Sequence, residues 1–373
     1  MVDERLSKLA KLLVNYSTEV KPGDKVFVSC NEIANPWLTE IIKEVIKAGA
    51  NVEYKLESEE ARRMKLKYST DEQLKEEGII FETVLEQVDV WLSAWGSKNT
   101  RNNTNIPAEK LKAFTIGSTK WRKSYSERMG NGSLRWCGTQ YPTNADAQEA
   151  SMSLEEYEDF VYGAGLLDKD DPVAEWKKIS AKQELWVKYL NTKSELHIIS
   201  EGTDITVGIK GRKWINCDGK VNFPDGEIFT SPIEDSINGH IKFSFPGIYV
   251  GKEIEGIELE VKDGKVISAK AEKGQDLLQT LLETDEGSSF FGEVAIGTNY
   301  GIKKFTRNML FDEKIGGTIH MAIGDSMPEA GGKNRSPLHW DMLCDMRNGG
   351  EIYADGELFY KNGHLIEEVL KNR

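Results

Sequence analysis

The sequence of 373 residues predicts an α/β protein, with an N-terminal mostly parallel α/β domain over residues 1–190 and a β-rich α+β domain over residues 191–373. In the first half, short apolar segments alternate with segments of helical period, an order that builds a parallel sheet with right-handed crossovers. From residue 194 onward, alternating apolar and polar residues run between Gly and Asp turns, which is typical of antiparallel strands. The pattern changes near residue 190, where we place the domain boundary.

The elements of the first half follow from their apolar period and their end signals. Leu6, Leu9, Leu12 and Leu13 form the apolar stripe of an opening helix. A helix over 36–50 has Pro36 near its first turn and ends at Gly49. Predicted strands cover 24–30, 51–56 and 88–96, and further helical segments lie near 58–68, 71–86, 153–166 and 171–191. The polar segment 97–110, which follows the third strand, is expected to be a solvated loop.

The second half is expected to be mostly antiparallel strands. They cover 194–200, 203–211, 238–247, 256–271, 318–324 and 338–342, with a helix over 274–284. Asp263-Gly264 lies between two alternating runs and is a strong signal for a two-residue hairpin turn.

Composition excludes several classes of function. With 48 basic and 61 acidic residues, the formal charge is −13, which disfavours a nucleic-acid or anionic-membrane partner. No run of 18 apolar residues predicts a membrane span, and charges at the N-terminus argue against a signal peptide. The four cysteines are widely spaced and form no CxxC pair, so we expect small buried residues in a cytoplasmic protein.

Familiar catalytic motifs are absent, which removes the simplest dinucleotide, NTPase, zincin and α/β-hydrolase interpretations. Two of only five histidines, however, fall close together near the C-terminus. His339 and Asp341 lie two positions apart in a predicted strand, so both point to one face, and His320 lies on the strand before it. Imidazole and carboxylate are the usual ligands of a hydrolytic metal site. Taken alone, such a pair is more often a surface pair or a hydrogen-bonded core histidine.

A site with two metal ions needs about five ligands, including a bridging carboxylate. Glu227 and Glu293 are candidates, because each follows a glycine and precedes an aliphatic residue in an apolar segment. A carboxylate in such a place needs a partner.

Four segments that carry these residues together resemble the thermophilic-type metallo-aminopeptidases, represented by aminopeptidase T and aminopeptidase S. They are FPDGEIFTSP (223–232), GEVAIGTN (292–299), FDEKIGGTIHMAIGD (311–325) and GGKNRSPLHWDM (331–342), in the order and spacing of that family.

The resemblance implies that Glu227, Glu293, His320, His339 and Asp341 bind two divalent metal ions (Zn, Co or Mn) in the second, catalytic domain. A metal-activated water would then hydrolyse N-terminal residues from a peptide substrate, with Glu227 and Glu293 as catalytic residues. The family also implies a homodimer.

One position departs from the family, which usually has a Tyr seven residues after the first histidine. Met327 stands here, and a thioether donates no proton. Either Tyr300 or another residue takes this role, or the activity is weak or altered. The alternative function is a mononuclear Fe(II) ring-cleaving dioxygenase of the same fold, with His320, His339 and Asp341 as the two-histidine, one-carboxylate triad. A third possibility is a metal-binding protein without turnover.

Overall fold

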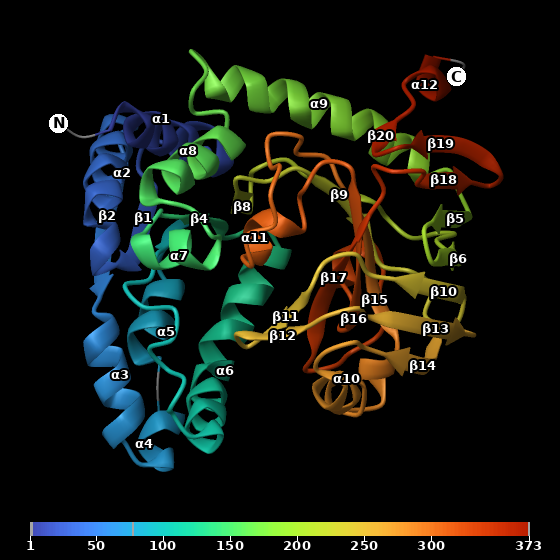
Figure 1. Ribbon diagram of the computed structural model, residues 1–373. Coiled ribbons are helices and arrows are strands. Elements are labelled where there is room, and N and C mark those ends of the chain that lie inside the picture. The colour runs from blue at the N-terminus through green and yellow to red at the C-terminus, as the bar shows by residue number, and fades with distance from the viewer. Residues whose placement is uncertain (1–2, 77, 372–373) are drawn as a thin grey trace. The chain divides into compact units, whose positions relative to one another are not determined.

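The computed structural model describes residues 3–76 and 78–371 and confirms the predicted fold class (Figure 1). The chain divides into two compact units. Unit 1 covers the chain up to Val173 together with Gly219–Pro224, and unit 2 covers Ala174–Asp218 and the chain from Asp225 onward. The division therefore lies at the start of helix α9 (Pro172–Leu190). The change in sequence pattern lies at the end of that helix, and the domain boundary at residue 190 stays a prediction.

Unit 1 contains an all-parallel sheet of five strands. In sheet order these are β2 (Asn51–Glu57), β1 (Lys25–Asn31), β3 (Val90–Trp95), β4 (Arg135–Gln140) and β8 (Asn222–Phe223). The first three were predicted from the sequence. Strand β8 comes from the segment that returns to unit 1, and it pairs with β4 at the edge of the sheet.

The helices of unit 1 are α1 (Glu4–Leu12), α2 (Asn35–Lys47), α3 (Glu59–Tyr68), α4 (Asp71–Lys75), α5 (Ile79–Leu85), α6 (Ala108–Gly130), α7 (Asn144–Glu149) and α8 (Leu154–Ala164). Helix α2 packs on β1 and β2. Phe27 and Trp91, on neighbouring strands, pack against Phe81 of α5 and Trp121 of α6. The helix expected over 71–86 is interrupted, because Gly78 adopts φ +107° directly before α5.

Unit 2 is built on two antiparallel sheets. The larger has the order β14 (Lys265–Lys270), β13 (Glu258–Lys262), β10 (Asn238–Lys242), β6 (Thr203–Gly208), β5 (Glu195–Ser200), β18 (Glu351–Ala354), β19 (Glu357–Lys361) and β20 (His364–Leu365). The smaller has the order β17 (His339–Asp345), β16 (Thr318–Gly324), β15 (Phe291–Gly297), β9 (Glu227–Thr230) and β7 (Ile215–Cys217). Unit 2 also contains the strand pair β11 (Gly247–Tyr249) and β12 (Lys252–Ile254), nearly all of helix α9, and the helices α10 (Gln275–Leu282), α11 (Met309–Asp312) and α12 (Glu368–Lys371).

The predicted hairpin between β13 and β14 is confirmed. Asp263 and Gly264 have φ of +48° and +80°. A two-residue type I′ hairpin turn requires such positive φ values at both of its residues.

One face of the five-stranded sheet lies in the main apolar core of unit 2. Ile228, Val294, Ile319 and Met321 are buried there with residues of the eight-stranded sheet, such as Ile198 and Val207. Each such side chain contributes roughly 1.5–3 kcal/mol when it leaves water. This apolar face fixes the strand register, because a slip of one residue would expose it and bury the alternate residues.

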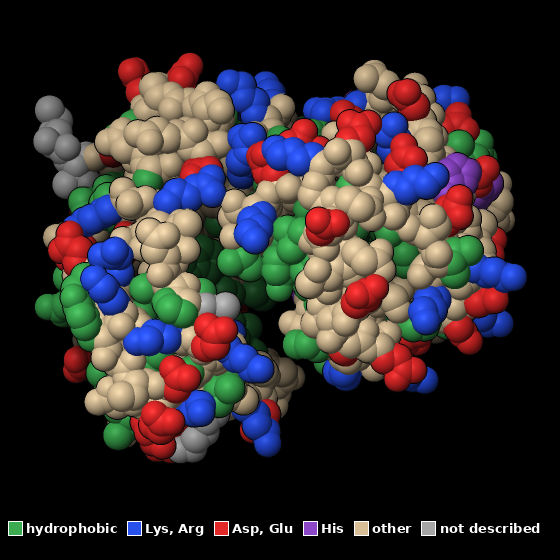
Figure 2. All heavy atoms as spheres, turned by 60° about the horizontal axis from the view of Figure 1, so that its bottom comes forward, with side chains coloured by type: hydrophobic (Ala, Val, Ile, Leu, Met, Phe, Trp, Pro, Cys, Tyr) green, Lys and Arg blue, Asp and Glu red, His purple; other side chains and the backbone are tan. Residues whose placement is uncertain are grey.

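Among the described residues, no helix has the length and apolar character that a membrane span requires. Acidic and basic side chains are interspersed over the face of the molecule shown in Figure 2.

Candidate metal centre

The face of the five-stranded sheet opposite to the apolar core carries all five residues that the sequence singled out. Strand pairing places Glu227 opposite Gly297, His320 opposite Ala295, and His339 opposite Gly324. Ala322 lies between Glu293 on β15 and Asp341 on β17. Because side chains alternate along a strand, these residues share one face.

Small residues leave space between these polar side chains. Ala295 and Ala322 are fully buried on the same face, each next to candidate ligands on the neighbouring strands. Larger side chains there would fill the space into which the imidazoles and carboxylates project.

The five side chains converge. His320 Nε2 lies 3.2 Å from Glu293 Oε1 and 3.5 Å from Glu227 Oε2. His339 Nε2 lies 3.6 Å from the other oxygen of Glu293, Oε2, and 3.5 Å from Asp341 Oδ1. Glu293 therefore lies between the two histidines, with one carboxylate oxygen facing each of them.

The glycine before each glutamate has a steric reason. Gly226 has φ +120°, and a Cβ there would lie 2.7 Å from the Cβ of Asn299. A Cβ at Gly292 would lie 2.0 Å from the carbonyl oxygen of Asp325. Only glycine permits these close approaches, so the two Gly-Glu pairs are needed to bring the glutamates to this face.

The carboxylates raise the pKa values of both histidines. Burial lowers the pKa of His320, but the hydrogen bond with Glu293 and the charge of Glu227 outweigh it and raise that pKa to about 9. Burial likewise lowers the pKa of His339, but its bond with Asp341 and the charges of Asp341 and Glu293 raise it to about 10. The cluster thus attracts positive charge strongly.

Burial acts in the opposite direction on the glutamates. It raises the pKa of Glu227 to about 8, although the Lys314 ammonium opposes this, and it raises the pKa of Glu293 against the hydrogen bond with His320. Burial also acts to raise the pKa of Asp341, but the bond with His339 outweighs it, and the net shift is downward.

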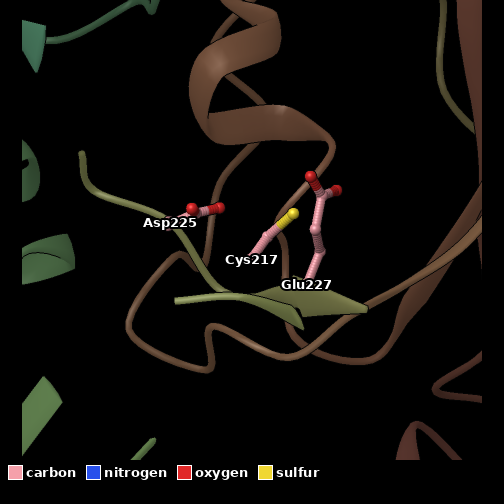
Figure 3. A group of neighbouring side chains, drawn as sticks. All are labelled: Cys217, Asp225 and Glu227. Carbon is pink, nitrogen blue, oxygen red and sulfur yellow. The ribbon is translucent and has the colours of Figure 1, made fainter. Parts of the chain in front are cut away.

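Three further residues lie beside Glu227 that the sequence did not single out. Lys314, which is fully buried, has its Nζ 3.7 Å from Glu227 Oε1 and 3.9 Å from Asp225 Oδ1, and it also pairs with Glu313. Figure 3 shows Cys217 on β7 with its sulfur directed toward the Glu227 carboxylate, and Asp225 on the segment that leads into β9. The one signal for Lys314 is its position in the segment FDEKIGGTIHMAIGD.

Cys217, Asp225 and Glu227 have ligand atoms within 4.8 Å of one another, as do Glu293, His339 and Asp341. The two groups differ in charge. The buried ammonium of Lys314 already faces Asp225 and Glu227, so it opposes a further cation between them. No Lys or Arg among the described residues forms an ion pair with the group around Glu293.

Met327 packs at the edge of the same face. Its side chain is partly buried against the cluster of Phe229, Ala295 and Ala330, and its backbone N–H donates to Ser231 Oγ at 3.0 Å. Tyr300, considered above as a replacement, donates its hydroxyl to the Gly363 carbonyl at 2.9 Å and stacks on His364. Its hydroxyl is therefore engaged away from these ligands.

The arrangement fits metal binding in three respects. Two ligands at about 2.1 Å from one tetrahedral ion lie about 3.4 Å apart, and the observed N···O separations are 3.2–3.6 Å. Glu227 Oε2 is buried and has no hydrogen-bond partner in the described part of the chain, which is costly unless something else satisfies it. His339 Nδ1 lies 2.9 Å from the Asp325 carbonyl, the contact that leaves Nε2 free for a metal.

Comparison with known proteins agrees with this chemistry. The sequence pattern of the thermophilic metalloprotease (M29) family matches residues 2–365 of this chain. Aminopeptidase AmpS of Bacillus subtilis is 27% identical, over 97% of this chain and 98% of its own length. Aminopeptidase 2 of Geobacillus stearothermophilus is 26% identical, over 98% of this chain and 99% of its own.

Two solved structures share the fold. AmpT from Thermus thermophilus superposes with a TM-score of 0.86 at 22% identity, covering 97% of this chain and 99% of its own. The 2,5-dihydroxypyridine dioxygenase from Pseudomonas putida superposes with a TM-score of 0.58 at 14% identity, covering 97% and 96%. At these identities the likeness concerns the fold alone.

Proposed function

Because the chain belongs to the thermophilic metalloprotease (M29) family, we propose that it is a metallo-aminopeptidase that removes N-terminal residues from peptides. We further propose that Glu227, Glu293, His320, His339 and Asp341 hold two divalent metal ions. The observation that carries this proposal is the position of Glu293, whose two oxygens face two different histidines. A carboxylate so placed would supply the bridging ligand of a two-metal site.

Glu293 divides the ligands into two sets. Glu227, His320 and one oxygen of Glu293 form the first, and the other oxygen of Glu293 with His339 and Asp341 forms the second. A mononuclear site built on His320, His339 and Asp341 would leave both buried glutamates without a role.

Charge balance supports two ions rather than one. Asp225, Glu227, Glu293 and Asp341 are all buried, while the charge of Lys314 is offset by Glu313. With neutral histidines these four carboxylates, together with that of Glu313, exceed the single Lys314 ammonium by four negative charges, equal to the charge of two divalent ions. Buried charge without such compensation costs several kcal/mol per group.

When bound, such ions would supply an activated water and polarise the peptide carbonyl. Residues of the chain orient the proposed ligands and favour their metal-binding charge state. The Asp325 carbonyl orients the His339 ring through Nδ1, and the Lys314 ammonium favours the ionised form of Glu227. Glu227 and Glu293 stay the proposed catalytic residues. The cytoplasmic location and the homodimer stay predictions, and light scattering of the purified protein tests the latter.

Metal content per chain tests the proposal. Protein purified without chelator is expected to contain about two divalent ions, as a two-metal site requires. Glu293→Gln should lower that content while the circular dichroism spectrum is retained, because an amide is a poor bridging ligand. Glu286→Gln, an exposed neighbour in sequence, is the matched control and should leave the content unchanged. One iron per chain would support the dioxygenase instead, and full occupancy in Glu293→Gln would remove Glu293 from the site.

A further inference from the structure

A cavity lies in unit 1, at the carboxyl ends of the parallel strands. It has a volume of about 1040 Å³ and is lined by the ends of β1 (Ser29 and Asn31), β2 (Glu57) and β3 (Ser93 and Trp95), together with α3, α5 and α6. The neighbours of β1 are β2 on one side and β3 on the other, so the order of strands reverses beside β1. In open α/β sheets, ligands bind at such a reversal, outside the carboxyl ends of the strands.

Many of the side chains that line the cavity are aromatic. Seven rings line it: Phe81, Trp91, Trp95, Phe114, Trp121, Tyr125 and Trp136. Phe81 stacks on Trp121 with ring centroids 5.0 Å apart, and Trp95 lies 6.1 Å from Trp136. Trp95 is nevertheless 41% exposed, and Leu56, Ile79 and Ile80, which also line the cavity, are exposed too. Apolar surface gathered in a concave site is typical of ligand pockets.

Two hydroxyls lie among these rings. Ser29 and Ser93 are register partners on β1 and β3, and both line the cavity. Ser29 Oγ accepts a hydrogen bond from Trp91 Nε1 at 2.9 Å. Ser93 is only 6% exposed, and its Oγ has no hydrogen-bond partner among the described residues. Such a buried hydroxyl is costly and is available to a polar group of a ligand.

Basic side chains outnumber acidic ones among the described residues that line the cavity, in a protein that is acidic as a whole. Among the described residues, Lys55, Arg62, Lys65 and Arg122 line the cavity with two carboxylates, Glu57 and Glu76. Lys55 is paired with Glu57 at 2.9 Å. Arg62 lies over Phe114 and Arg122 over Trp121, and neither is in a salt bridge with a described residue. Two guanidinium groups beside aromatic rings favour an anion on an aromatic body.

We propose that this cavity binds a small planar aromatic molecule that carries a negative charge. Its ring stacks among Trp95, Trp121 and Trp136, and its anionic group pairs with Arg62 and Arg122. This site belongs to unit 1 and uses none of the candidate metal ligands. The inference is therefore independent of the proposed peptidase function.

Calorimetric titration with three naphthalene probes of matched size tests the proposal. The probes are naphthalene-2-sulfonate, 2-naphthalenemethanol and 2-naphthylmethylammonium, and a sulfonate is a weak ligand for metals. The sulfonate is expected to bind at least about tenfold more tightly than the neutral and cationic probes, a difference of about 1.4 kcal/mol. Glu293→Gln should bind the sulfonate as the wild type does, which separates this site from the metal centre.

Variants locate the binding. Arg62→Gln combined with Arg122→Gln should abolish the preference for the sulfonate, while Lys123→Gln, an exposed neighbour outside the cavity, should retain it. Trp95→Ala should weaken all three probes by about fivefold or more, as loss of one stacking surface does. The proposal is overturned if the sulfonate does not bind at a concentration of about 1 mM. It is also overturned if all three probes bind equally, or if the arginine and Trp95 variants bind the probes as the wild type does.

Discussion

Met327 packs against the cluster of Phe229, Ala295 and Ala330, at the position where the family resemblance implies a tyrosine. A tyrosine hydroxyl there would be able to donate a hydrogen bond to a developing oxyanion, which a thioether cannot do. The loop that carries Met327 is fixed by two contacts between its backbone and Ser231. A tyrosine ring at position 327 would therefore be attached to a backbone that these contacts hold in place.

Met327→Tyr is expected to raise turnover of leucine p-nitroanilide by a factor on the order of 100, the usual effect of one oxyanion donor. Metal content should be unchanged. Met327→Phe is the matched control, because it adds the ring without the hydroxyl and should bring no gain. Equal rates for the tyrosine and phenylalanine variants, measured at equal metal content, would show that position 327 does not limit the reaction.

The raised pKa values of His320 and His339 predict an unusual dependence of stability on pH. In the metal-free protein the pKa values of His320 and His339 are raised to about 9 and about 10, and that of Glu227 to about 8. Each folded-state value lies above the ordinary value of about 6.5 for His or 4.3 for Glu. The folded protein therefore binds more protons than the unfolded chain, so these groups make stability fall as pH rises from about 5 to 10.

Metal binding opposes this loss of stability at higher pH, because protons compete with metal for the imidazoles. Thermal unfolding of chelator-treated protein should show a Tm that decreases between pH 6.5 and 10, and metal affinity should increase over the same range. His339→Gln should reduce the slope, whereas the exposed His240, replaced by Gln, should not. A flat or rising Tm in the metal-free protein would contradict this account of the cluster.

At the scale of helices and strands, the alternation of residues with a period of two was the most informative sequence pattern. The strand predicted over 318–324 is β16, and the predicted strand with His339 and Asp341 is the start of β17. Local alternation sufficed there because the opposite face is entirely apolar. The hairpin at Asp263-Gly264 was predictable for an equally local reason, the backbone conformation of the turn itself.

Elements that depend on distant partners were not predictable in this way. Helix α6 and strand β4 were not predicted, since α6 has no clear apolar stripe and β4 contains Gly138, which admits the rings of Trp95 and Trp136. Strand β8 has only two residues and exists because it pairs with β4. In the site, Lys314 and Cys217 reach Glu227 only through the tertiary fold.

The small residues of β15 and β16 give a prediction for this sheet. Ala322 lies between Glu293 and Asp341, so Ala322→Val should crowd both carboxylates. We expect reduced metal content and a loss of about 1–3 kcal/mol in the free energy of unfolding, the usual cost of overpacking. Met321→Leu, on the core face of the same strand, should keep the metal and lose less than about 1.5 kcal/mol. Full metal content in Ala322→Val would show that this space is not part of the site.

For the whole molecule, the two units differ in what stabilises them. All five candidate ligands belong to unit 2, where the proposed metal ions would compensate buried carboxylates. Unit 1 has its own parallel sheet and its own apolar clusters. Metal removal is therefore expected to act on unit 2 alone.

Differential scanning calorimetry with and without chelator checks this expectation. A ligand present at about 1,000 times its Kd stabilises the folded state by about 4 kcal/mol, which is on the order of 10 °C in Tm for a unit of this size. We expect chelation to lower one of two transitions by about that amount and to leave the other in place, and the metal-deficient Glu293→Gln should show the lowered transition without chelator. Equal shifts of both transitions would contradict independent units. No shift, at a metal content shown to have fallen, would mean that the buried carboxylates are compensated by protons on His320, His339 and Glu227 instead of by metal.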